Sequence, residues 1–280
     1  MKTDKPKVSK ILLSILPAVC YIILSDIAYA LPLYFPPSDD NPFARHYEFI
    51  SQVLCLVISL LIGFSIFRKS DTINVKKIFD CKEFNILPPV MSALFLYAAS
   101  QLIVLTLRAI VPAPEFSGEP SSENILLYLN SLPNYDIHRI HFIEDWQNIV
   151  FSLLLAPVAI ELLFRYFAIK MPAKHFSIPV LCLANGLLFA FSGGNLSGMI
   201  FALIGGAAMA LVFLKTEKLL YTIIAHALYN LTTLIPQLNY WFHENNQTGF
   251  TGIVWIAIQA VLLAIPVIWF FTSFRKRSTT

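Results

Sequence analysis

Charge is the property that this sequence most lacks. Charged residues make up 13% of its 280 residues and hydrophobic residues 57%, whereas a soluble domain has about 25% and about 45–50%. A net charge of +3 is too small and too scattered to indicate a nucleic-acid partner. The 23 Phe, 11 Tyr and 4 Trp exclude a disordered chain. The composition therefore predicts a polytopic membrane protein.

The sequence also lacks a cysteine framework. Its four cysteines form no CxxC pair and mostly fall within apolar runs: Cys20, Cys55, Cys81 and Cys182. A disulfide scaffold or a zinc site is indicated by short, regular cysteine spacings. We therefore expect these thiols to be buried packing residues.

Long apolar runs are what the sequence has instead. A membrane-crossing helix needs about 20 mostly apolar residues, because the hydrocarbon core is about 30 Å thick. Eight stretches meet this need: residues 11–34, 47–67, 85–111, 146–169, 177–193, 199–214, 219–239 and 251–274. The fifth and sixth are the shortest, and the glycine-rich segment 193–198 between them predicts a tight or re-entrant turn.

Basic residues test this count independently. Sixteen of the 20 lysines and arginines precede the first span or follow the second, fourth, sixth and eighth, whereas the opposite loops hold Arg45 and Arg139. Basic loops stay in the cytoplasm, so we predict an all-α, polytopic transmembrane helical bundle of about eight spans with both termini cytoplasmic. The basic start, an apolar run and Ala28-Tyr29-Ala30 also fit a signal peptide, but Asp26 and the seven further spans favour an uncleaved anchor.

The longest segment outside the spans is the outer loop 112–145. His138 and His141 lie three residues apart there, and Glu144 and Asp145 follow, which is one pattern for a metal site. An amphipathic interfacial segment, with Trp146 in the aromatic belt of the membrane, explains the same residues. We favour the interfacial interpretation.

Four polar residues lie inside the predicted hydrocarbon region. Glu161 and Arg165 share one face of the fourth span, and His226 and Asn230 share one face of the seventh, because residues four apart are neighbours on a helix. Glu161 and His226 lie at similar depths, roughly 12–13 Å from the cytoplasmic end of their spans. Ionisable residues at such a place are costly and indicate function. A hydrated cavity and a set of contacts that pin helices together are equally compatible with this pattern.

Three short motifs resemble those of the CAAX protease and bacteriocin-processing family of intramembrane endopeptidases. They are Glu161-x3-Arg165, then Phe189-Ala-Phe-Ser-Gly193, then His226-x3-Asn230. The family pattern is Glu-Glu-x3-Arg, Phe-x3-His and His-x3-Asn, and the similarity covers about residues 146–235. We expect three parts: residues 1–145 with three spans and the outer loop, a family-like core of four spans at 146–239, and the last span with a basic tail at 240–280.

Two departures from the family pattern concern its chemistry. Ile160 stands where the first glutamate of the family lies, and Gly193 stands where the histidine of the second motif lies. The resemblance implies that these two groups activate the water, that Glu161 with Arg165 corresponds to the second glutamate and its arginine, and that His226 with Asn230 resembles an oxyanion-binding element. Amide hydrolysis needs a base or a metal to deprotonate the water, and isoleucine and glycine provide neither.

No cofactor is expected. Glu161, His226 and Asn230 form a thin ligand set for zinc, which prefers histidine, cysteine and carboxylate, although a divalent metal stays an open alternative. The partners that we expect are the lipid bilayer and a membrane-embedded peptide or protein.

Three hypotheses about function follow. The favoured one is a pseudoprotease that binds a membrane peptide or protein on a protease scaffold. The second is an active endopeptidase with a non-standard base; the resemblance then implies cleavage of membrane-proximal peptide bonds, as in peptide maturation or bacteriocin immunity. The third is a small transporter with Glu161, Arg165 and His226 on its path, but the paired halves typical of transporters are not visible.

Overall fold

The computed structural model describes residues 8–34, 46–68, 84–110, 146–170, 172–193, 196–234 and 250–275. Within these ranges the regular structure is helical and contains no strand. The loop 112–145, with its two histidines, and Cys81 lie outside the described residues. The predicted all-α fold class is therefore confirmed.

The helices follow the predicted spans closely. They are α1 (Val8–Tyr34), α2 (Tyr47–Phe67), α4 (Leu87–Ile110), the fourth span (residues 146–170, described below), α9 (Ile178–Ala190), α10 (Leu196–Thr216), α11 (Leu219–Leu234) and α13 (Phe250–Arg275). Six of them are long and apolar enough to cross a membrane, and α9 and α11 are shorter apolar helices. The sixth span was predicted too short: α10 has 21 residues because it begins within the glycine-rich segment. The predicted residues 235–239 of the seventh span lie outside the described ranges.

The fourth span is a chain of short helical pieces. It consists of α6 (Trp146–Val150), the π-helical η2 (Phe151–Leu155), α7 (Ala156–Glu161), the π-helical η3 (Leu162–Phe167) and α8 (Ala168–Lys170), and the 3-10 turn η4 (Pro172–Lys174) follows. Short π-helical turns within α-helices occur often at functional sites. Glu161 and Arg165, two of the polar residues that the sequence singled out, lie in this irregular span.

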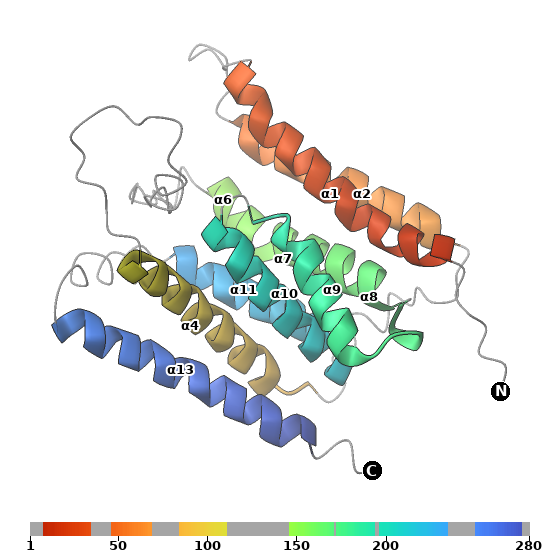
Figure 1. Cartoon of the computed structure of the whole chain (residues 1–280). Coiled ribbons are helices and arrows are strands. Elements are labelled where there is room, and N and C mark those ends of the chain that lie inside the picture. The colour runs from red at the N-terminus through yellow and green to blue at the C-terminus, as the bar shows by residue number, and fades with distance from the viewer. Residues whose placement is uncertain are drawn as a thin grey trace, which may run out of the picture.

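The helices form a slab of neighbours around the fourth span (Figure 1). Helices α1 and α2 pair along one side of the bundle, and α13 packs on α4 along the opposite side. The fourth span contacts α1 and α2 on one flank, and α9 and α11 on others. It is therefore the most enclosed segment, which explains why its residues from Glu161 to Ile169 are all buried.

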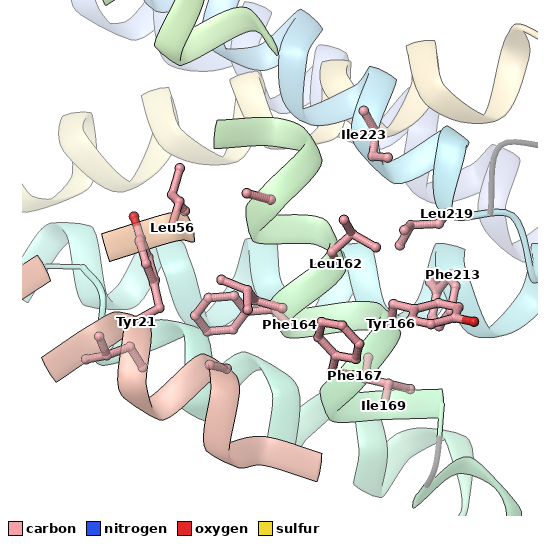
Figure 2. Close-up of a cluster of buried hydrophobic side chains, with 14 of the residues drawn as sticks. Tyr21, Leu56, Leu162, Phe164, Tyr166, Phe167, Ile169, Phe213, Leu219 and Ile223 are labelled. Atoms are coloured by element: carbon pink, nitrogen blue, oxygen red, sulfur yellow. The ribbon is translucent and has the colours of Figure 1, made fainter. Parts of the chain in front are cut away.

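Aromatic side chains fill the core around the fourth span (Figure 2). Phe164 and Phe167 are buried there, and the ring of Phe167 stacks on Phe67 of α2 with a centroid distance of 5.3 Å. Tyr21 of α1 meets Phe164 edge to face at 6.3 Å. Such ring contacts contribute about 0.5–1.5 kcal/mol each beyond burial. They fix α1 and α2 against the fourth span.

Helices α9 and α10 approach closely through small residues. A Cβ atom on Gly186 of α9 would lie 2.5 Å from the carbonyl oxygen of Leu203 and 3.2 Å from the Cβ atom of Ala207. Small residues let helix backbones come together in a membrane. This contact holds α9 beside the fourth span, where it presents Asn185 and Phe189.

Two of the described cysteines are partly buried and the third, Cys55, is buried, all as free thiols: Cys20, Cys55 and Cys182. The expectation of buried packing residues is therefore confirmed for Cys55, whereas Cys20 and Cys182 are only partly buried.

Candidate functional site

Glu161 lies at the centre of a buried polar cluster. Its carboxylate oxygen Oε2 lies 3.2 Å from Nε of Arg165, one turn further along the fourth span, and both side chains are at most 1% exposed. Its other oxygen, Oε1, lies 2.9 Å from Nδ1 of His226 on α11. The structure thus brings together three of the four polar residues that the sequence placed in the membrane. Oε1 thus has a hydrogen-bonding ring nitrogen, whereas Oε2 has the charge of Arg165 beside it and no hydrogen-bond partner among the described residues.

The contact with Glu161 orients the imidazole of His226. An ionised carboxylate only accepts hydrogen bonds, so the proton lies on Nδ1 of His226 and donates to Oε1 of Glu161. When the ring is neutral, the other ring nitrogen, Nε2, is the acceptor. The side chain of His226 is 15% exposed, whereas that of Glu161 is fully buried. His226 is therefore the member of the cluster that another molecule reaches first.

Arg165 is held from a second side by an aromatic ring. Its guanidinium carbon lies 4.8 Å from the centre of the Phe189 ring on α9, the distance of a cation–π contact. The atom Nη1 of Arg165 is buried and has no hydrogen-bond partner among the described residues. Phe189 opens the second family-like motif, so the first two motifs meet through these two side chains.

The side-chain amide of Asn230 bonds to the backbone of the fourth span. Its Nδ2 atom donates to the carbonyl oxygen of Ser152 at 2.7 Å. In η2 the N–H of Ala156 bonds to the carbonyl of Phe151, five residues earlier. In the same register the carbonyl of Ser152 would accept from the N–H of residue 157, which is Pro157. Proline has no N–H to donate. Asn230 therefore supplies the hydrogen bond that Pro157 withholds, which in a membrane no water would replace.

A second asparagine makes the same kind of contact at η3. Nδ2 of Asn185 donates to the carbonyl oxygen of Phe164 at 2.5 Å, and the side chain is buried. The sequence analysis missed this residue. The signal was present, because Asn185 is the one amide in the apolar stretch 178–190 and lies four residues before Phe189, on the same face of α9.

Gly193 lies in the turn after α9, which ends at Ala190. In α9 Asn185 meets Phe164 and Phe189 covers Arg165, and position 193 follows Phe189 by four residues.

Position 193 has no room for a side chain. A Cβ atom there would lie 2.5 Å from the carbonyl carbon of Gly198 and 2.7 Å from its oxygen, and it would overlap the backbone nitrogen of Met199. These are backbone atoms at the beginning of α10, so they move only if the helix moves. Ile160, at the other departure from the family pattern, packs against the hydrophobic core.

In the described ranges no group of three or more His, Cys, Asp or Glu side chains is arranged to hold a metal ion. The cluster itself pairs one carboxylate with one imidazole and one guanidinium, and a guanidinium cannot serve as a ligand because it always carries its positive charge. The absence of a cofactor stays a prediction.

Comparison with known proteins agrees with these motifs. Residues 142–232 match the family described as type II CAAX prenyl endopeptidase Rce1-like. The resemblance predicted from the motifs is confirmed. The matched segment takes in the fourth span from Trp146, α9, α10 and nearly all of α11, so it contains every residue of the polar cluster. No curated protein and no solved structure matches the chain.

The match and the helices together establish the setting of the site. Proteins of the Rce1-like family are integral membrane proteins, and six helices here are long and apolar enough to cross a bilayer. The chain is a multi-pass membrane protein, and its segment 142–232 is similar to proteins of the CAAX-protease type. The roles of Glu161, Arg165, His226 and Asn230 stay predictions.

Proposed function

We propose that this protein is a pseudoprotease: it uses an intramembrane endopeptidase scaffold to bind a membrane-embedded peptide or protein without cleaving it. The observation that carries this proposal is the lack of space for a side chain at position 193. The backbone of Gly198 and Met199 occupies the place where a side chain would begin. A water-activating histidine at this position would require the start of α10 to move.

The chemistry of the remaining residues supports the proposal. Attack on an amide needs a base that is free to take a proton from water. Glu161 has Arg165 on one oxygen and His226 on the other, and it is fully buried. Asn230 already donates to Ser152. What is left for another molecule is Nε2 of the partly exposed His226, which as the acceptor of a neutral ring would take an N–H or a hydroxyl of a bound segment.

The contact between His226 and Glu161 favours a second candidate function, an active endopeptidase. A carboxylate that accepts from Nδ1 of a histidine leaves Nε2 as a base, which is the arrangement that activates nucleophiles in hydrolases. In this alternative His226 takes the proton from water and Glu161 orients the imidazole. The partial exposure of His226 is compatible with both candidates.

Cleavage separates the two candidates. The purified protein in proteoliposomes is mixed with a panel of membrane-anchored peptides, and products are read by mass spectrometry. We expect no products from the natural chain. Products that the natural chain forms, and that disappear in His226→Ala while this variant keeps its abundance and its melting temperature, would establish the active enzyme instead. Thr232→Val, on the same helix as His226, is the control, and it should leave the cleavage products and the melting temperature as they are in the natural chain.

Binding is tested separately by photo-crosslinking. A photoreactive amino acid replaces Leu231, an exposed residue about one and a half turns from His226 on α11, or, as a control, the still more exposed Ile268 on α13. We expect adducts of an uncleaved peptide from position 231 and none from position 268. Equal adducts from both positions would mean that the peptides only share the bilayer with the protein, and the proposed binding function would then be wrong.

A further inference from the structure

The π-helical segment η3 sets the orientation of α7, which carries Glu161, relative to the part of the fourth span that follows. Glu161 lies directly before η3 and Arg165 lies within it. At the end of η3 the N–H of Ala168 is shared between the carbonyl of Leu163, five residues earlier, and that of Arg165, three residues earlier. An α-helix would bond four residues earlier, and one residue corresponds to about 100° of rotation. Glu161 and Arg165 are neighbours in either register, but a return of η3 to α-helical register would rotate Glu161 relative to the residues after η3, which pack on α1.

Asn185 holds this segment from outside the fourth span. Its amide donates at 2.5 Å to the carbonyl of Phe164, in the middle of η3 and directly before Arg165. A carbonyl oxygen has two lone pairs, so it accepts from Asn185 besides a donor of its own helix. Phe189, one turn along α9, covers the guanidinium of Arg165 at 4.8 Å. Helix α9 thus fixes both the backbone and the side chain at this point.

A role that only anchors α9 to the fourth span does not explain why an asparagine is buried at position 185. Its Oδ1 atom is buried without a hydrogen-bond partner among the described residues. A half-satisfied amide in an apolar interior costs free energy, and α9 already packs on α10 through Gly186. An apolar residue would anchor α9 at lower cost.

We propose that Asn185 is a positioning residue, which keeps η3 in its π-helical register so that Glu161 faces His226 on α11. The inference rests on the proposed use of this cluster as the binding site. It nevertheless concerns the geometry of the cluster, and a measurement that needs no substrate tests it.

The test is the ¹⁵N spectrum of the histidine side chains in detergent micelles. Labelled protein has six histidines, and the spectrum of His226→Ala assigns the signal of His226. Glu161→Gln gives the position of the Nδ1 signal when the carboxylate is lost. We expect Asn185→Leu, which has the same shape but no donor, to move the signal toward that position. Asn185→Ala is the second variant, in case leucine prevents folding.

Met209→Ala is the matched control. Met209 is buried in a separate cluster with Leu96 and Ala225, so its truncation lowers stability without touching η3. We expect a lower melting temperature and an unchanged His226 signal. If the Asn185 variants likewise melt earlier and leave the His226 signal unchanged, Asn185 only anchors α9 and the proposal is wrong. Because no cleavage or peptide binding enters this measurement, it can fail or succeed independently of the pseudoprotease function.

Discussion

Removing the charge of Glu161 while keeping its shape is the strongest perturbation that the structure suggests. In Glu161→Gln the guanidinium of Arg165 loses the carboxylate that lies 3.2 Å from its Nε atom, and both side chains are at most 1% exposed. Breaking a buried ion pair by removing one partner costs about 3–5 kcal/mol, because a buried charge is left unpaired. The unfolding equilibrium constant should therefore rise by about two to four powers of ten. The amide of glutamine still accepts from His226, so the loss reports mainly on the charge.

A double-mutant cycle isolates the contribution of the unpaired charge to the free energy of unfolding. Arg165→Met should also destabilise the protein, but Glu161→Gln with Arg165→Met should cost less than the sum of the two single changes, since no unpaired charge remains. Free energies of unfolding in mixed detergent micelles provide the measurement. Thr232→Val is the control, and we expect it to stay within about 0.5 kcal/mol of the natural chain. If the two single changes each cost under about 1 kcal/mol and add, the pair is solvated and our description of a buried, coupled cluster is refuted.

Two further predictions concern the free energy of unfolding and are measured in the same way. Gly193→Ala should lower it by about 1–3 kcal/mol, because the new Cβ atom meets backbone. Gly205→Ala should lower it less, since its Cβ atom would meet a flexible leucine side chain at 3.0 Å. Equal losses in the two variants would contradict the steric argument. Asn230→Leu should cost about 1–3 kcal/mol because the carbonyl of Ser152 loses its donor. Pro157→Ala returns an N–H to the fourth span, so Asn230→Leu should cost less in that background, and an undiminished cost would show that Asn230 acts elsewhere.

The asparagine contacts change what the third motif means in this chain. A His-x3-Asn pair resembles an oxyanion-binding element when it is read as sequence. Here Asn230 is committed to the carbonyl that Pro157 leaves without a donor, and His226 is committed to Glu161. The same motif thus joins α11 to the fourth span at two points about one turn apart. A motif that binds helices together in this way can persist without catalysis.

The sequence by itself determined the membrane class, the helices and the resemblance. Apolar length is a local property, so the predicted 47–67 and the helix Tyr47–Phe67 agree at both ends. The pairing of Glu161 with Arg165 is local as well, because four residues on a helix bring two side chains to one face.

Only the tertiary structure decided the contacts between distant segments. Glu161 and His226 lie 65 residues apart, and Asn230 and Ser152 lie 78 apart; spacing cannot tell which of several facing groups they meet. The π-helical register that directs Asn230 and Asn185 to carbonyls depends on neighbouring helices, and so does the lack of space at Gly193, which the start of α10 imposes. Composition and periodicity describe each helix alone, whereas these features arise from the way the helices pack.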